Sequence, residues 1–227
     1  MHIDLIFQPG NSAARVALGP NESITAEGGA MIAMSGDMAI ETSTKKRGGG
    51  GGILSGLKRM LSGESFFMNH FTAGSNGGEL FLATTLPGDM MQLDLQGETI
   101  IVQSGSFVAC SDGVDIDLGW QGFKSLLSGE SVFWLKISGT GKVILSSFGA
   151  IYPQQVNGEY IVDSGHIVSF DETLQFKITK PGKSWLNAIM GGEGLVCKFE
   201  GQGTVWCQSH NPSSFGWELG SLLKPRN

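Results

Sequence analysis

The 227-residue sequence has few basic residues and no long apolar run. It carries 15 Lys and Arg against 21 Asp and Glu, which gives a net charge of −6. A surface that follows nucleic-acid phosphates needs a basic face, so we expect no nucleic-acid partner. A membrane-spanning helix needs about 18 or more consecutive apolar residues, and no stretch of the sequence approaches this length. We therefore predict no membrane span.

Cysteine is also scarce. The chain has three, Cys110, Cys197 and Cys207, an odd number without a C-x-x-C motif. This pattern argues against a disulfide framework and fits a reducing compartment. The N-terminus has an early acid, Asp4, and no basic start before an apolar run, which is unlike a signal peptide. We expect a cytoplasmic protein, in which Cys197 and Cys207 face each other across a predicted hairpin.

Motifs for catalysis, metals and nucleotides are missing as well. The four histidines do not show the spacing of zinc ligands. Ser62 and Ser128 lie near glycines but lack the G-x-S-x-G pattern of a nucleophile elbow. The run Gly48–Gly52 resembles a phosphate-binding loop only in composition, because no G-x-x-x-x-G-K-[ST] motif is present. We expect no cofactor and no metal, and we identify no catalytic residue.

Glycine, in contrast, is abundant, with 35 residues. This is about twice the usual frequency of ~7%. Many glycines beside β-branched and aromatic residues indicate tight turns between short strands. The composition therefore favours a mainly β protein.

Two sequence markers occur three times in the same order. Leu-Ser-Gly-Glu-Ser at 61–65 returns at 127–131 and, in weaker form, at 190–194. A glycine followed by apolar residues precedes each copy, at 29–32, 105–108 and 165–168. Such an ordered recurrence indicates one structural unit used three times.

The predicted units cover about 14–84, 91–146 and 154–208, followed by a C-terminal tail at 211–227. A unit of roughly 60 residues buries little apolar surface alone, so we expect one domain over 1–227 with a shared core.

Within each unit, alternating apolar and polar residues predict short strands. In the second and third units we expect turns at Gly97-Glu98 and Gly158-Glu159, and glycine hairpins at 139–141 and 201–203. Apolar positions at helical spacing in 53–61, 123–127 and 185–190 predict one short helix in each unit. The expected fold is a mainly β, sandwich- or prism-like body of three pseudo-equivalent β-rich repeats with short helices.

Some of these motifs resemble one known family. The run Glu27–Met31, the glycine loop, and Gly63–Phe67 with Asn69 and Phe71 are similar to small bacterial proteins of unknown function. Those proteins are related to the eukaryotic altered inheritance of mitochondria proteins. The resemblance covers nearly the whole chain. It implies a β-rich fold like that of the tryptophan RNA-binding attenuation protein, with pseudo-threefold repeats. It supplies no catalytic residues, and a shared fold does not transfer function.

The repeated acids Glu64, Glu130 and Glu193 are the candidates for a polar-ligand or cation site. Pseudo-symmetry would bring them together around one axis. In the alternative that we favour, each carboxylate accepts hydrogen bonds from backbone N–H groups in a turn after the helix.

A second candidate surface is basic. Lys45, Lys46 and Arg47 precede a glycine tether and a helix that carries Lys58 and Arg59, a combination that suits an anionic membrane surface. The alternative is that this helix packs inward as in the other two units, and that 45–52 is an insertion in a surface loop.

The leading hypothesis for function is a non-enzymatic scaffold or binding module of unknown ligand. We expect it to form a homo-oligomer through strand edges or the aromatic tail, because sheet edges are usually paired or covered. The alternatives are a membrane-surface or stress-associated organising protein, and an enzyme with an unrecognised site.

Overall fold

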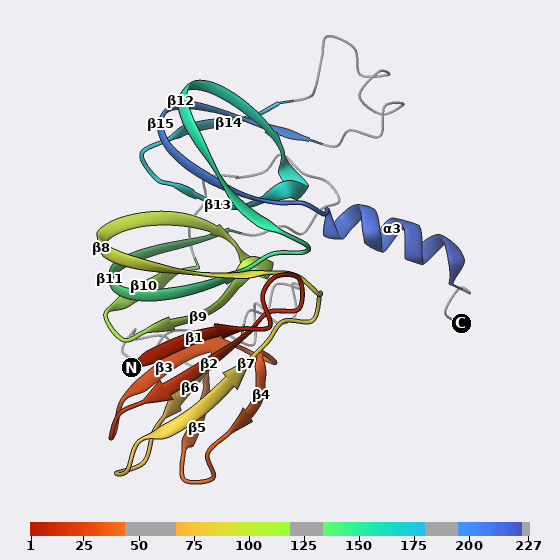
Figure 1. The fold of residues 1–227 in the computed structure, drawn as a ribbon. Coiled ribbons are helices and arrows are strands. Elements are labelled where there is room, and N and C mark those ends of the chain that lie inside the picture. The colour runs from red at the N-terminus through yellow and green to blue at the C-terminus, as the bar shows by residue number, and fades with distance from the viewer. Residues whose placement is uncertain (44–66, 119–133, 180–194, 224–227) are drawn as a thin grey trace.

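The structure is a computed structural model that describes residues 1–43, 67–118, 134–179 and 195–223. It consists mainly of antiparallel β-strands (Figure 1), which confirms the predicted fold class. Several predicted features lie outside the described residues. They are the loop at 45–52, the three short helices, and the candidates Glu64, Glu130, Glu193, Lys45, Lys46, Arg47, Lys58 and Arg59.

The strands form three lobes that follow one another along the chain. The N-terminal lobe contains β1 (His2–Ile6), β2 (Ala13–Leu18), β3 (Ser23–Glu27), β4 (Met31–Met34), β5 (Ala39–Ser43), β6 (Met68–Thr72) and β7 (Gly78–Leu82). The middle lobe contains β8 (Met90–Gln103), the 3-10 turn η1 (Ser104–Ser106), β9 (Phe107–Ser111), β10 (Val114–Asp117) and β11 (Trp134–Ser146). The third lobe contains β12 (Ile151–Asp163), η2 (Ser164–His166), β13 (Ile167–Asp171), β14 (Gln175–Thr179) and β15 (Val196–Gln208).

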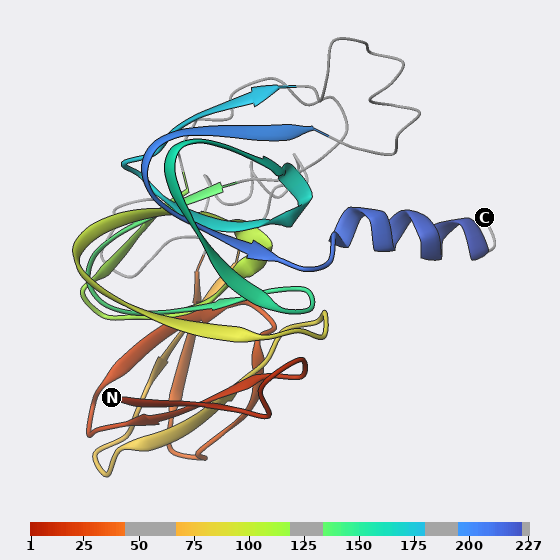
Figure 2. The ribbon, with the colours of Figure 1, turned by 45° about the horizontal axis from the view of Figure 1, so that its top comes forward.

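The lobes are stacked in chain order, with the N-terminal lobe at one end and the third lobe at the other (Figures 1 and 2). Strand pairing crosses both boundaries between them. β9 of the middle lobe pairs with β3 of the first, and β13 of the third lobe pairs with β8 of the middle one. An 11-stranded sheet therefore runs through all three lobes, while β1, β2, β7 and β4 form a second, four-stranded sheet.

The middle and third lobes show the same order of elements: a long strand, a 3-10 turn, two short strands and a second long strand. The pseudo-threefold relation of 14–84, 91–146 and 154–208 stays a prediction, which a least-squares superposition of three segments from an experimental structure would test.

The long strands differ from the expected pattern of turns and hairpins. β8 and β12 pass through Gly97 and Gly158 without ending, and β11 and β15 pass through 139–141 and 201–203. Gly158 and Gly201 are paired with each other and have φ of +107° and +122°. Two facing glycines in this left-handed region bend the paired strands together, so their hydrogen bonding continues where turns were predicted.

The continuous β15 also corrects the expected placement of two cysteines. Cys197 and Cys207 lie near opposite ends of this one strand, opposite Val162 and Tyr152, and so are not paired with each other across two strands. Both thiols are buried, and burial raises the pKa of Cys197 to about 12 and that of Cys207 to about 11.

The apolar core is divided among the lobes but shared across their boundaries. The core of the first lobe includes Val108 and Ile144 of the middle lobe. The core of the middle lobe includes Val168, and that of the third includes Ile101. Each lobe therefore completes its core with side chains from its neighbour, as expected for units too small to bury enough surface alone.

The C-terminal tail forms an α-helix, α3 (Pro212–Leu222), that sequence analysis did not predict. Asn211 caps it, because its side-chain oxygen accepts hydrogen bonds from the backbone N–H groups of Ser213 and Ser214. The helix projects from the body (Figures 1 and 2) and has no buried residue. Within the described parts of the chain, no helix combines the length and the apolar character needed to cross a membrane.

The boundary between the middle and third lobes is strengthened by an aromatic cluster around Phe170. Its ring is fully buried and packs edge-to-face on Trp134, Phe176 and Phe199, with centroid distances of 5.7, 5.2 and 5.1 Å. We predict that Phe170→Ala lowers the free energy of unfolding by about 3–5 kcal/mol, since it leaves a cavity in this cluster. Urea unfolding measures the loss. Phe7→Ala, at a residue that is 73% exposed, is the control. Equal losses in the two variants would contradict the role of the cluster.

Candidate functional site

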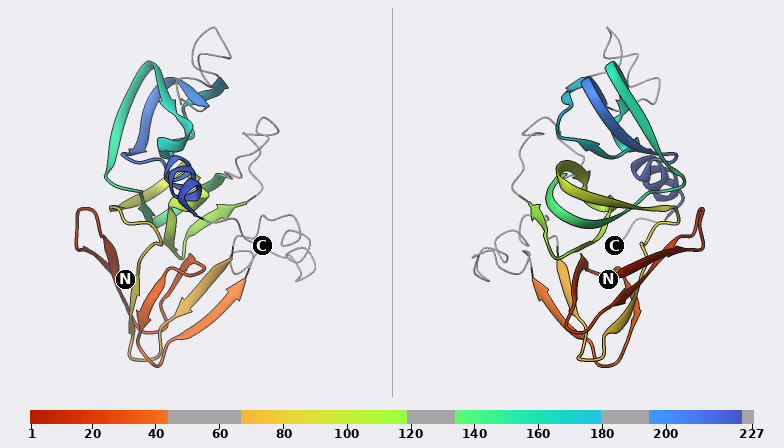
Figure 3. Two further views of the ribbon diagram at one scale, coloured as in Figure 1. Left: turned by 90° about the vertical axis from the view of Figure 1, so that its right-hand side faces the viewer. Right: turned by 60° about the vertical axis from the view of Figure 1, so that its left-hand side comes forward.

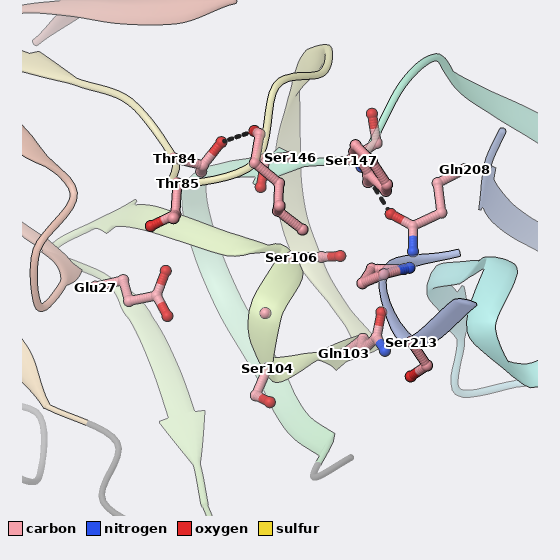
Figure 4. Close-up of a pocket in the computed structure, with 14 residues that line it drawn as sticks. Glu27, Thr84, Thr85, Gln103, Ser104, Ser106, Ser146, Ser147, Gln208 and Ser213 are labelled. Carbon is pink, nitrogen blue, oxygen red and sulfur yellow. Dashed lines mark hydrogen bonds between the residues drawn. The ribbon is translucent and has the colours of Figure 1, made fainter. Parts of the chain in front are cut away.

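A cavity of about 380 Å³ lies where the ends of the three lobes meet (Figure 4). Its walls come from the end of β3, from η1, from the two connectors between lobes, and from the junction of β15 with α3. The lining residues are Glu27, Thr84, Thr85, Leu86, Gln103, Ser104, Gly105, Ser106, Ser146, Ser147, Phe148, Gln208, Pro212 and Ser213. Segments that are distant in sequence thus form one polar site.

The two connectors are held together behind the cavity. Gly88 and Gly149 form a parallel bridge, and the backbone N–H of Ser147 donates to the carbonyl of Asp89 at 3.0 Å. A Cβ atom on Gly88 would fall onto the carbonyl of Ser147, so only glycine allows this crossing. The Ser147 hydroxyl donates to the carbonyl of Gly149 at 2.8 Å. These contacts fix the position of the connector wall.

Gln208 fixes the third lobe against the same wall. Its side chain is buried, and its Oε1 atom accepts from the backbone N–H of Phe148 at 2.8 Å. Its Nε2 atom donates to the carbonyl of Gly165 at 2.9 Å. Both ends of the amide are therefore engaged in holding β15, η2 and the connector together.

The first turn of α3 forms the rim of the cavity. Pro212 and Ser213 line it, and the ring of Phe148 packs against His210 and Phe215 with centroid distances of 5.1 and 5.3 Å. The start of the helix is thus anchored on the cavity wall, whereas the rest of the helix extends away.

Glu27 is the one acidic or basic side chain among the described residues that line the cavity. It ends β3 and is half-buried, and this burial raises the pKa of its carboxyl from 4.5 to about 7. No hydrogen bond or ion pair to this carboxylate is found among residues 1–43, 67–118, 134–179 and 195–223. A desolvated carboxyl with no such partner, facing a polar cavity, is typical of a functional site.

The polar groups that the cavity offers are of few kinds. They are hydroxyl groups, amides and one carboxyl, and the described residues of the lining include no histidine, lysine or cysteine that would activate a serine. In the part of the chain that the structure describes, no cluster of three or more His, Cys, Asp or Glu side chains is arranged to hold a metal ion.

Sequence reasoning missed this site, although a signal was present. A polar residue precedes each of the three marker glycines by two positions: Glu27, Gln103 and Asp163. Glu27 and Gln103 line the cavity, whereas Asp163 caps η2 by accepting from the backbone N–H of Gly165 at 2.8 Å. The acids that we singled out instead, Glu64, Glu130 and Glu193, lie outside the described residues.

Comparisons with known proteins place the chain among similar sequences and folds. Residues 6–210 match the profile of the mitochondrial biogenesis AIM24 family. The chain is 29% identical over 207 residues to an uncharacterised protein of Streptococcus pyogenes serotype M6. This match covers 88% of the chain and 82% of that protein. The crystal structure of a Streptococcus pyogenes protein has a TM-score of 0.79 at 25% identity and covers 98% of this chain and 99% of its own.

The raised pKa of Glu27 predicts a pH-dependent stability. The folded chain holds this proton up to about pH 7, whereas the unfolded chain loses it near pH 4.5, so stability falls as the pH rises between these values. Because one pKa unit corresponds to about 1.4 kcal/mol, Glu27→Gln should be more stable than the unsubstituted chain at pH 8, by at most roughly 3 kcal/mol. At pH 4 the two should unfold alike in urea. A variant less stable than the parent at pH 8 would contradict this assignment.

Proposed function

We propose that this chain, which belongs to the mitochondrial biogenesis AIM24 family, is a non-enzymatic scaffold or binding module that associates with copies of itself. Its membership confirms the resemblance inferred from the motifs. The observation that supports self-association is a pair of exposed strand edges, β4 and β12, whose counterparts are buried between lobes.

Both boundaries between lobes are built in the same way. At the first, Ala109 of β9 lies opposite Ala26 of β3; at the second, Ser169 of β13 lies opposite Val102 of β8. In each case the short strand after the marker glycine pairs with the strand that precedes a marker glycine. At both boundaries the lobes are therefore joined by antiparallel backbone hydrogen bonds and by the burial of the paired side chains.

β4 occupies the place of β9 and β13 in the first lobe, but it is an edge strand. All three strands pair with the last strand of their lobe through a register shift after the first residue. The residues at this shift are Ile32 in β4, Val108 in β9 and Val168 in β13. Val108 and Val168 are fully buried, whereas Ile32 is 58% exposed. β4 therefore presents an apolar edge where the other two lobes have a neighbour.

β12 is the complementary edge at the other end of the 11-stranded sheet. Tyr160 and Ile161 correspond to Ile100 and Ile101 of β8 by their pairing with the last strand of each lobe. They are 40% and 54% exposed, whereas Ile100 and Ile101 are buried. Apolar side chains at an unpaired edge favour pairing with another strand.

The two edges lie at opposite ends of the stack (Figures 1 and 3). Pairing β4 of one copy with β12 of the next would repeat the boundary between lobes, with Met34 opposite Ile161. Such a head-to-tail contact is heterologous, because it joins two different surfaces. Copies joined in this way form a closed ring when the rotation between neighbours allows it, and an open filament when it does not. This geometry supports the proposal of a scaffold built from successive lobes.

The helix α3 favours a second candidate, a membrane-surface or organising protein. Phe215, Leu219 and Leu222 recur at helical spacing on one face, and Trp217 is 82% exposed. Exposed apolar and aromatic residues on a projecting helix suit the interface of a lipid bilayer. The helix also offers another surface for self-association.

The proposed register predicts a specific disulfide between copies. Met34→Cys combined with Ile161→Cys should form covalent dimers and larger species on a non-reducing gel, since paired strands bring Cα atoms to about 5.5 Å. The three native cysteines are buried and do not compete. Each single variant, and Met34→Cys with Glu159→Cys two positions away, provide the controls. Monomers alone from the matched pair would contradict the register.

The two surfaces can be separated by single charges. We expect Ile161→Asp to reduce the mass measured by light scattering at micromolar concentration to that of the monomer, because a carboxylate in a strand pair must be desolvated. Trp217→Asp and removal of 211–227 should leave the mass unchanged. A strictly monomeric parent would rule out self-association, and a monomer produced by truncation would move the interface to α3. If the parent chain floats with anionic liposomes and Trp217→Asp abolishes this flotation, the result would instead favour the membrane-surface role.

A further inference from the structure

We infer that the cavity between the three lobes binds a small organic cation, whose ammonium group pairs with the carboxylate of Glu27 (Figure 4). This inference concerns a ligand site within one chain and is independent of the contacts between copies.

The charge of the lining selects the sign of the ligand. Of the described residues, fourteen line the cavity, and these include one acid and no Lys, Arg or His. A phosphate or carboxylate ligand would meet the negative charge of Glu27 with no cation to offset it. A positively charged group would gain from the same carboxylate, more strongly than in water because the site is partly desolvated.

Most other polar groups of the lining are already committed. The Gln208 amide is engaged at both ends, the Ser147 hydroxyl donates to Gly149, and the Thr84 hydroxyl donates to the carbonyl of Leu86 at 3.1 Å. These groups shape the cavity. The carboxylate of Glu27 has no such bond within the described ranges, so it is left to meet a ligand.

An ammonium group brings three N–H donors and no acceptor, so it needs more than one oxygen around it. Figure 4 shows Glu27 and Thr85 on one side of the cavity and Ser147 and Gln208 on the other, with Ser106 between the two sides. The hydroxyl of Thr85 lies on the side of the carboxylate and can accept an N–H bond there, and the hydroxyl of Ser106 is a further acceptor toward the middle of the cavity. The site thus offers one charge and neutral oxygens, as an ammonium group requires.

The size and remaining lining indicate that the cation is organic. A volume of about 380 Å³ lies within the range of small-molecule pockets, about 300–1,000 Å³. Leu86, Phe148 and Pro212 add apolar surface for a carbon body. A bare divalent ion would need several carboxylate or carbonyl ligands, and one carboxylate does not supply them.

Ionisation of Glu27 links this binding to pH. Other titratable groups near the cavity face partners behind its walls: Asp89 accepts from Ser12 at 2.7 Å, and Asp163 accepts from Gly165. His166 donates to the carbonyl of Gln208 at 2.8 Å, and a hydrogen bond of 2.8 Å joins Nδ1 of His210 to the hydroxyl of Ser209. Because the pKa of Glu27 is about 7, a cation must displace its proton at lower pH.

The test is isothermal titration of the full chain with n-butylammonium, 1,4-diaminobutane and spermidine, beside 1,4-butanediol and butyrate as uncharged and anionic probes. We expect saturable binding of at least one amine, about tenfold tighter at pH 8 than at pH 6, from the ionised fractions of a group with a pKa near 7. At pH 6, the heat should change with the ionisation enthalpy of the buffer, which reports the released proton. The diol and butyrate should not bind.

Glu27→Gln should abolish amine binding while it keeps a cooperative melting transition. Asp112→Asn, which removes one charge from an exposed turn, and Ile161→Asp, which alters the strand edge, should bind like the parent. Equal binding by Glu27→Gln, equal affinity for the diol, or no saturable binding of any of the three amines at either pH would overturn the proposal.

Discussion

The pairing of strands across the boundaries between lobes is the constraint on which the rest of the structure depends. Units of roughly 60 residues bury too little apolar surface to be stable alone. Here β9 and β13 belong to the sheet of their own lobe and also extend the sheet of the preceding one. The same side chains that complete one core, such as Val108 and Val168, lie on these shared strands. Backbone hydrogen bonding and apolar burial therefore act at the same places.

This construction has two consequences. A series of similarly paired boundaries must start and end somewhere, and among the described strands the ends are the exposed edges β4 and β12. Natural proteins usually blunt such edges with charge, whereas Ile32 and Ile161 leave these apolar. The second consequence is that the connector between β7 and β8 and the connector between β11 and β12 run side by side. Their crossing at Gly88 and Gly149 fixes the connector wall of the cavity, which Glu27 lines from the end of β3.

The cavity and the edges differ in what they imply physically. The edges present backbone donors and acceptors with apolar side chains, which suits another strand of similar composition. The cavity presents a single carboxyl, neutral oxygens and a small apolar wall, which suits a small molecule. Phe148 lies between the cavity and α3, since it lines the one and packs on Phe215 of the other. The start of the helix is thus positioned by the same residues that shape the site.

Glycine content, strand alternation and the repeated markers were enough to predict a mainly β chain, and the combined motifs identified the family. Local patterns of this kind suffice because residues close in sequence largely determine the backbone conformation and which side chains of a strand are buried or exposed. The helix α3 had a readable signal, Asn211 before Pro212, but Gly216 and Gly220 weaken its propensity.

Other features were decided only by the tertiary structure. A glycine with positive φ serves a turn or a bent strand equally well, and the facing partner strand made Gly97 and Gly158 bends. The cavity joins residues between 27 and 213, and the raised pKa of Glu27 results from burial among them. No local pattern encodes desolvation by distant segments, because it arises only when the lobes are stacked.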